Sequence, residues 1–127
     1  MFKIIEDLPE DVVGIEAAGK LTHEDYTGKL IPLLNEALKK HDKVKLLYVI
    51  GPEFDGFELA ALWDDTSYGL HHWHDVSHIA MVTEENWIRA MMAMFAPLFP
   101  GEVRIFGLSE IGHAKEWISN AHHKAAA

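Results

Sequence analysis

The run VKLLYVI at Val44–Ile50 decides the fold class of this chain. Continuous apolar sequence of this kind predicts a strand covered on both faces, and such strands are usually parallel and central in a sheet. Gly51-Pro52 is expected to end the strand, because proline has no amide donor and both residues favour turns. Ile79–Val82 has the same two-faced pattern, and Val103–Phe106 predicts a last strand. The sequence therefore predicts an α/β protein.

The N-terminal part of the chain is predicted to form a β-hairpin followed by a helix. The apolar runs Phe2–Glu6 and Val12–Ala18 are separated by DLPED, whose proline and acidic residues favour a turn. Thr22, with Asp25 three residues later, has the spacing of a capping box, so a helix should begin there. Pro32 falls inside the apolar stripe of that helix. Because proline removes a hydrogen-bond donor, the helix is expected to bend at Pro32 or to begin afresh.

Three further helices are predicted after the central strand. The first is Asp55–Trp73, capped by its own first residue. Thr83 is expected to cap the second, Glu84–Phe95, and Ser109 is expected to cap the third, Glu110–Asn120. Together with the strands, this order predicts a mixed five-stranded sheet with an N-terminal hairpin, a mostly parallel remainder and about four helices on its faces.

The composition and charge indicate one globular domain in a reducing compartment. The 127 residues are 49% hydrophobic and 24% charged and contain no Cys, which excludes a disulfide framework and fits the cytoplasm. One domain is expected over residues 1–120, with a disordered tail at 121–127. The formal net charge of -9 disfavours nucleic acid as a partner. No apolar run reaches the roughly 18 residues that a membrane span needs.

The stretch FDGFELAALWDDTSYGLHHWHDVSHIAMVTEENW at Phe54–Trp87 contains most of the side chains that are able to do chemistry. Its histidines are His71, His72, His74 and His78. His71 and His74 have an i,i+3 spacing that can hold a metal ion on a helix. However, the run crosses the expected end of a helix, where the side chains should splay apart, and the helix dipole favours histidine there without any ligand. No metal or other cofactor is therefore expected.

The sequence contains no arrangement of residues that is typical of an active site. Asp64 and Asp65 are adjacent, and neighbours on a helix point about 100° apart, so they cannot act together on one substrate. There is no G-x-S-x-G elbow and no P-loop. Glu53, Asp55 and Glu58 surround the helix start at which an anion would be expected to bind, which disfavours a phosphate ligand. We therefore expect a protein that is not an enzyme.

The segment WIRAMMAMFAPLF from Trp87 to Phe99 is apolar on nearly all sides. A core helix needs only one apolar face, so four alternatives remain: a buried helix, an interface with a second chain, contact with a membrane, or the wall of a pocket. Pro32 and Gly56 would permit such a pocket to open. The candidate ligand-binding residues are the aromatic and Met side chains of this segment and of the preceding predicted helix: Phe54, Phe57, Trp63, Trp73, Trp87, Met91 and Phe95.

Three motifs give the chain a resemblance to a known family. They are F-x-G-F-E-x-x-A-x-W-x-D beginning at Phe54, I-A-M-V-T-x-x-x-W at Ile79–Trp87, and G-E-V-R-I-F at Gly101–Phe106. In these motifs, and over nearly the whole chain up to Asn120, the sequence resembles the SpoIIAA-like family. The resemblance implies the STAS-type fold, which is related in topology to the CRAL-TRIO lipid-carrier domain. It also implies a small bacterial protein that is not an enzyme, binds apolar small molecules and associates peripherally with membranes.

Two departures from the family pattern affect the expected function. Anti-sigma-factor antagonists of this fold carry a phosphorylated Ser at the helix start that here holds Asp55-Gly56-Phe57, so a phosphoserine switch is not expected. Relatives often have Lys or Arg where this chain has His71 to His78, so attraction to anionic lipid should require protonation at mildly acid pH. Two hypotheses follow: a carrier of an apolar or lipid-like ligand, or a homodimeric protein–protein interaction module.

Overall fold

A computed structural model describes residues 1–61, 67–68, 71–72 and 74–121 of the chain. The strands are β1 (Phe2–Ile4), β2 (Val12–Leu21), β3 (Val44–Phe57), β4 (Val76–Val82) and β5 (Glu102–Phe106). The α-helices are α1 (His23–Asp25), α2 (Ile31–Lys40), α4 (Asn86–Phe95) and α5 (Ile111–Asn120). Between them lie the π-helix η1 (Tyr26–Leu30) and the 3-10 helices η2 (Ala96–Leu98) and η3 (Leu108–Glu110).

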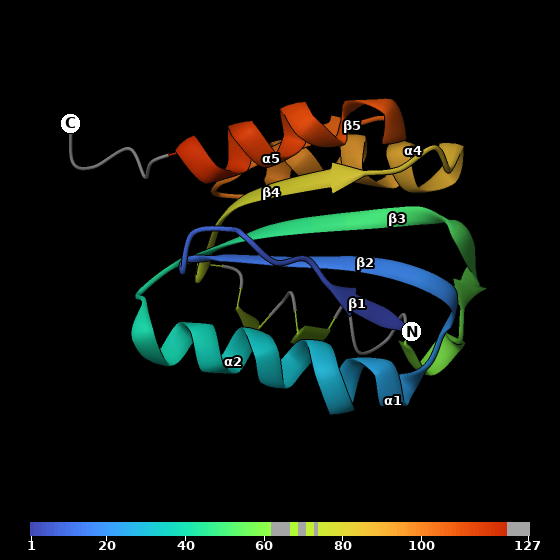
Figure 1. Cartoon of the computed structure of the whole chain (residues 1–127), viewed down its shortest axis with the longest axis horizontal. Helices are drawn as coiled ribbons and strands as arrows, with labels where there is room; N and C mark the ends of the chain where they lie inside the picture. Colours follow the sequence, from blue (N-terminus) through green and yellow to red (C-terminus); the bar gives the residue numbers. More distant parts are fainter. Residues whose placement is uncertain (62–66, 69–70, 73, 122–127) are drawn as a thin grey trace.

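The five strands form one sheet in the order β1-β2-β3-β4-β5. β1 pairs antiparallel with β2, whereas β2, β3, β4 and β5 are parallel to their neighbours. Parallel neighbours need crossover connections, and helices supply them, so the sheet has a helical layer on each side. Figure 1 shows α2 and α5 on opposite sides of the strands. The predicted mixed five-stranded sheet, with its N-terminal hairpin and central parallel strands, is confirmed.

Each face of the sheet has its own hydrophobic core. Val44, Tyr48 and Ile50 of β3 pack in a cluster that includes residues of η1, α2 and α4. The alternate residues Leu47 and Val49 pack in a second cluster, which includes residues of α5. Successive side chains of a strand point to opposite faces, so both faces of this strand must be apolar. This alternation is the physical basis of the continuous apolar run in the sequence.

The third strand is longer than the sequence predicted. β3 continues through Gly51-Pro52 to Phe57, because β2 keeps pairing with it as far as the Leu21–Phe57 pair. The register shifts on both sides of Gly19, which has a φ of 65°. Such a bulge relaxes the ladder locally, and proline is tolerated there because its missing donor is not needed. The predicted strand end at Gly51-Pro52 is therefore wrong.

The helix predicted to begin at Asp55 begins later. Asp55 lies in β3, and helical backbone begins at Leu59, so Asp55 is not a helix cap. Strand pairing outweighs the local capping pattern here, because β2 satisfies the backbone groups of this segment. The predicted end of this helix, Trp73, lies outside the described residues.

The helical backbone continues through Pro32. Thr22 caps α1 in a complete capping box: its hydroxyl accepts from the Asp25 amide, and the Asp25 carboxylate accepts from the Thr22 amide. The chain then forms the π-helix η1 before α2 begins at Ile31. Pro32 falls in the first turn of α2, and the Ile31 amide just before it donates to the Tyr26 carbonyl across the π turn. Leu30 and Ile31 both have right-handed helical dihedrals, so the expected fresh start at the proline is not observed.

Two of the predicted caps lie close to, but not at, the observed helix starts. The Thr83 hydroxyl accepts from the Glu85 amide at 3.0 Å, and α4 begins at Asn86 rather than at Glu84. Ser109 lies inside η3 and does not cap α5. The Glu110 carboxylate instead accepts from the Gly107 amide at 2.8 Å, because a short 3-10 turn separates β5 from the helix. None of the helices in the described part of the chain is long and apolar enough to cross a membrane.

Candidate ligand-binding cavity

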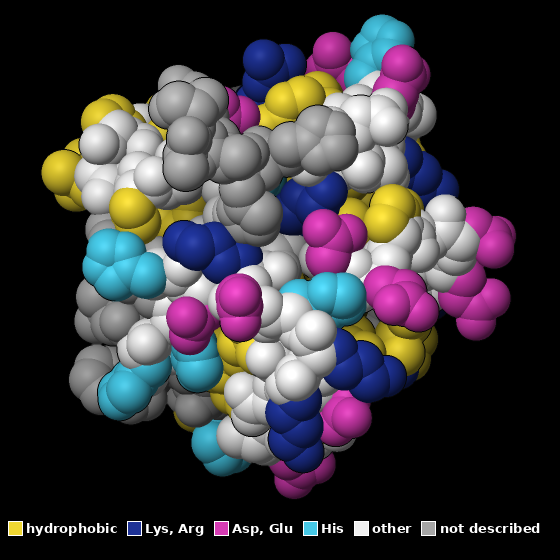
Figure 2. Space-filling view, turned by 90° about the vertical axis from the view of Figure 1, so that its left-hand side faces the viewer, with side chains coloured by type: hydrophobic (Ala, Val, Ile, Leu, Met, Phe, Trp, Pro, Cys, Tyr) yellow, Lys and Arg dark blue, Asp and Glu magenta, His cyan; other side chains and the backbone are white. Residues whose placement is uncertain are grey.

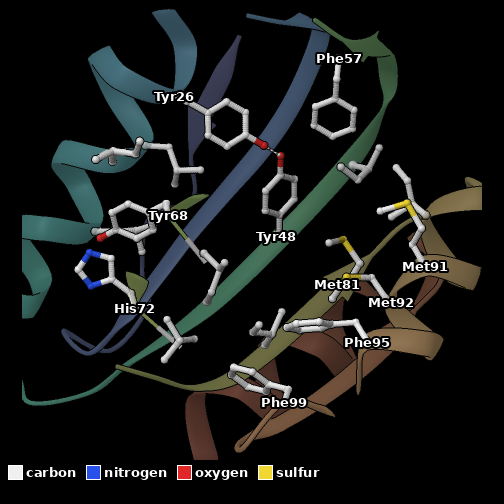
Figure 3. A pocket seen from close by; sticks show the side chains of 18 of the residues that line it. Tyr26, Tyr48, Phe57, Tyr68, His72, Met81, Met91, Met92, Phe95 and Phe99 are labelled. Atoms are coloured by element: carbon white, nitrogen blue, oxygen red, sulfur yellow. Dashed lines mark hydrogen bonds between the residues drawn. The ribbon is translucent and has the colours of Figure 1, made fainter. Parts of the chain in front are cut away.

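A cavity of about 490 Å³ lies over one face of the sheet, between η1 and α2 on one side and α4 on the other. Figure 3 shows this arrangement, with Tyr26 on one wall, Met91, Met92 and Phe95 on the opposite wall, and Tyr48 between them. The floor is formed by β3 and β4, through Leu46, Tyr48, Ile50, Ile79 and Met81. These floor residues belong to the set of alternate strand positions that faces α2 and α4.

The first wall is formed by η1 and α2. Tyr26 and Leu30, the ends of the π-helix, are both buried and both line the cavity, as do Ile31 and Leu34 of α2. A π-helical turn is uncommon and is frequently found at functional sites. Here both ends of η1 face the cavity, as residues four apart on a helix do.

The second wall is α4, which is the Met-rich helix of the sequence. Ile88 is buried and Met92 is half-buried, and both face the cavity. Trp87, Met91 and Leu98 also line the cavity but keep 44%, 54% and 72% of their surface exposed, so they form its rim. The surplus of apolar surface noted in the sequence therefore has a structural explanation: one part of it lines a cavity, and another part is exposed beside the opening.

Among the described residues that line the cavity, the polar side chains lie at two places. The hydroxyls of Tyr26 and Tyr48 are 2.9 Å apart and buried, with the ring of Phe2 packed edge-on against both. At the other place, the Tyr68 hydroxyl donates to Asn35 Oδ1 at 2.9 Å, and the His72 ring stacks on Tyr68 at 4.1 Å. Figure 3 shows the phenol pair near the middle of the cavity and Tyr68 with His72 farther along it.

The Tyr68 phenol is held in its neutral form. Desolvation by burial, with a smaller contribution from the negative charge of Asp75, raises its pKa from 10.0 to about 12. Asp75 in turn accepts from, or pairs with, His72 Nδ1 at 2.8 Å. The end of the cavity next to Tyr68 is therefore polar but carries no anionic phenolate at neutral pH.

The histidines do not converge on a common point. His71 Nδ1 lies 3.0 Å from the Ser67 carbonyl oxygen, and His72 is bound to Asp75. His78 lies on the other face of the sheet, where its ring packs against Trp117 at 5.8 Å. Within residues 1–61, 67–68, 71–72 and 74–121, no three His, Cys, Asp or Glu side chains are grouped to hold a metal ion. Figure 2 shows several histidine side chains at the lower left of one face of the molecule, and acidic and basic side chains interspersed over the rest of that face.

The structure brings together four of the seven predicted ligand-binding residues. Phe57, Trp87, Met91 and Phe95 line the cavity. Phe54 does not, but its ring packs against Phe57 at 5.2 Å, and Phe57 packs against Trp87 at 6.0 Å. Trp63 and Trp73 lie outside the described residues. That these side chains contact a ligand stays a prediction.

The sequence analysis missed one wall of the cavity. It placed the pocket between the predicted Phe54–Trp73 and Trp87–Phe95 helices, and Tyr68 and His72 of the first segment do line the cavity, but η1 and α2 form a wall that was not predicted. Tyr26 and Tyr48 were not singled out, although each is an aromatic residue with a polar group inside an otherwise apolar stripe. A buried tyrosine must find a hydrogen-bond partner, and this requirement was the signal available in the sequence.

The comparisons with known proteins agree with this architecture. The profile of the SpoIIAA-like family matches residues 12–119. The chain is also similar to the crystal structure of an uncharacterized protein of the DUF3478 family, with a SpoIIAA-like fold, from Shewanella loihica PV-4. The TM-score is 0.74 and the identity 30%, over 93% of this chain and 92% of that chain. No curated protein matches. The chain belongs to the SpoIIAA-like family.

Proposed function

We propose that the chain is a binding protein without catalytic activity, which holds a small apolar or lipid-like molecule in the cavity between α2 and α4. The observation that carries the proposal is the cavity itself: about 490 Å³, almost wholly apolar, with two small groups of polar side chains. Ligand pockets typically measure roughly 300–1,000 Å³ and combine apolar walls with a few polar groups that fix orientation.

The side chains around the cavity also support binding rather than catalysis. The pair His72 and Asp75 resembles part of a catalytic arrangement, since the carboxylate lies 2.8 Å from Nδ1. A nucleophile within hydrogen-bond reach of the other ring nitrogen would be needed to complete it. The described residues that line the cavity include no Ser, Thr or Cys. The tyrosine hydroxyls are neutral phenols, and their role in this proposal is to orient a ligand.

The test compares two substitutions on α4, one at a residue that lines the cavity and one at a residue that does not. Met92→Trp adds bulk at a half-buried residue that lines the cavity, whereas Met94→Trp makes the same change at a residue that is 78% exposed and does not line it. The probe is N-phenyl-1-naphthylamine, an uncharged dye whose fluorescence rises in apolar surroundings. We expect the unmodified protein and Met94→Trp to bind the dye alike, and Met92→Trp to bind at least about tenfold more weakly.

A thermal measurement provides a second readout. A ligand that binds only the folded state at a concentration of 100 times its Kd stabilises the fold by about 2.7 kcal/mol. The dye should therefore raise the Tm of the protein and of Met94→Trp, but not that of Met92→Trp. Equal dye binding by both variants, or no binding by the unmodified protein, would show that the cavity is not the site.

The second candidate function is a homodimeric protein–protein interaction module. The apolar residues Trp87, Met91, Met94 and Leu98 follow each other at helical spacing and are 44%, 54%, 78% and 72% exposed. An exposed apolar row of this kind is typical of helix–helix contacts. Light scattering tests this alternative: Met94→Glu should convert a dimer to a monomer, while His113→Glu on α5 should leave the mass unchanged. A monomeric unmodified protein contradicts it.

Peripheral association with a membrane is the remaining alternative for this row. In this alternative the protein acts in the cytoplasm and touches the inner surface of a membrane. The contact would use the same exposed side chains. Such a helix would insert its apolar edge among the lipid head groups. Co-sedimentation with phosphatidylcholine vesicles tests it, and Met94→Glu should abolish the association if it occurs.

A further inference from the structure

The floor of the cavity and the start of its α4 wall come from a part of the chain that has no positive charge. No Lys or Arg occurs between Lys45 and Arg89, a stretch that contains most of β3, all of β4 and the first turn of α4. None of the described residues that line the cavity is Lys, Arg, Asp or Glu. A ligand inside it would therefore meet apolar side chains, phenols and one imidazole, but no fixed cation.

The two cations that flank this stretch, Lys45 and Arg89, form hydrogen bonds with backbone carbonyl groups. The Lys45 side chain is buried, and its Nζ donates to the Ala121 carbonyl at 2.7 Å, beyond the end of α5 on the opposite face. The Arg89 guanidinium donates to the carbonyl oxygens of Thr83 and Phe106, at 2.8 and 3.2 Å. Both groups are already used by the fold, so neither provides a counter-ion for a charged group in the cavity.

The remaining electrostatics disfavour an anion. The net charge of the chain is -9, and the Asp75 carboxylate lies directly behind His72 at the cavity wall. Moving a carboxylate from water into apolar surroundings without a partner is strongly unfavourable, whereas a hydroxyl costs far less and can be compensated by one hydrogen bond. The Tyr26 and Tyr48 hydroxyls, 2.9 Å apart, are uncharged polar groups on the wall and floor of the cavity, beside which an uncharged ligand oxygen can lie.

We propose that the cavity selects an uncharged amphiphile, a medium-length alkyl or isoprenoid chain ending in an alcohol or carbonyl, over the carboxylic acid or phosphate ester of the same chain. The inference rests on the proposed function and specifies its ligand class. Size is consistent with it, because about 490 Å³ lies within the roughly 300–1,000 Å³ typical of pockets for small ligands. The oxygen of the ligand would lie at the Tyr26–Tyr48 pair and the chain would lie along Met81 and Met92.

The experiment measures, by isothermal titration at about pH 8, the binding of decan-1-ol and of decanoate to the unmodified protein. At this pH the acid is ionised, so the two compounds share a ten-carbon chain and differ in their head group, an uncharged hydroxyl in one and a carboxylate in the other. We expect decan-1-ol to bind at least about tenfold more tightly than decanoate. Decyl phosphate, which carries more charge, should bind no better than decanoate.

A matched pair of substitutions shows whether the missing cation is the cause. Met91→Lys places an ammonium at the rim of the cavity, and Met94→Lys places the same charge on α4 at a residue that does not line it. Because a partly exposed ion pair contributes up to about 1 kcal/mol, Met91→Lys should strengthen decanoate binding by roughly two- to fivefold. Met94→Lys should leave decanoate binding unchanged, and decan-1-ol should bind Met94→Lys as tightly as it binds the unmodified protein.

Each outcome separates this inference from the proposed function. If decanoate binds the unmodified protein as tightly as decan-1-ol, the selection of uncharged ligands is refuted, while the function as an apolar-ligand carrier stands. If both Lys variants strengthen decanoate binding equally, the effect is one of net charge and not of the cavity, which also refutes the inference. If neither compound nor the uncharged dye binds, the proposed function itself fails.

Discussion

The lysine in the central strand should stabilise the fold through a single charged hydrogen bond. The side chain of Lys45 is 6% exposed, and its Nζ donates to the Ala121 carbonyl at 2.7 Å, next to the last turn of α5. The Asp11 carboxylate is 3.5 Å away but is itself 35% exposed. The ammonium thus ties the sheet to the end of α5, while its ion pair with Asp11 is partly solvated.

The expected magnitudes follow from these contacts. Lys45→Met keeps the length of the buried stem and removes the hydrogen bond, which for a charged donor contributes about 1.5–3 kcal/mol. Lys45→Ala removes in addition three buried methylenes at about 0.8 kcal/mol each, so its total loss should reach about 4–5 kcal/mol. Asp11→Asn weakens only the partly exposed ion pair, which is worth at most about 1 kcal/mol.

Urea unfolding of the three variants provides the measurement, with the slope against urea showing whether the unfolded state has changed. We expect Asp11→Asn to be the most stable of the three variants, Lys45→Met to be less stable, and Lys45→Ala to be the least stable. Amide exchange at the end of α5 should accelerate in both Lys45 variants. If Lys45→Met proves as stable as the unmodified protein, desolvation of the ammonium cancels its hydrogen bond, and the reasoning is refuted.

Three further predictions concern the cavity and the sheet. In a double-mutant cycle of Tyr26→Phe and Tyr48→Phe, urea unfolding should give a coupling of roughly 0.5–1.5 kcal/mol; additive losses would contradict their hydrogen bond. Burial raises the pKa of Tyr68 from 10.0 to about 12, so the neutral phenol stabilises the fold below pH 10 and this stability is lost as the pH rises toward 12. A midpoint near pH 10 in an NMR titration of Tyr68 would contradict this. Gly101→Ala should lower the free energy of unfolding by about 1–3 kcal/mol, because the added Cβ meets the Ser77 carbonyl of β4, which cannot rotate away; a neutral effect in urea would contradict it.

Local sequence signals predicted those parts of the fold that depend on neighbours in the chain. The capping box of Thr22 and Asp25 formed as expected, since both partners lie within one helical turn. The same kind of signal failed at Asp55, where β2 extends the pairing of β3 beyond Pro52. A residue near a possible helix start has no local indication that a strand distant in sequence will bind its backbone groups.

The candidate site was predicted in part for the same reason. Trp87, Met91 and Phe95 were identified because the excess of apolar residues on one helix is visible without a structure. The facing wall, with Tyr26, and the floor, with Tyr48, could not be assigned. Their meeting depends on a π-helix and on strand pairing, and neither has a reliable signature over a few residues.

The sequence by itself determined the layered α/β architecture. Burial on both faces of a strand requires apolar residues at consecutive positions, and such runs are visible in the sequence. The tertiary structure alone decided that η1, β3 and α4 meet around a cavity of about 490 Å³ whose described lining residues include no Lys or Arg. Cavity shape depends on how far two helices stand apart over a shared sheet. That distance is set by side chains that are remote in the chain and touch only after folding.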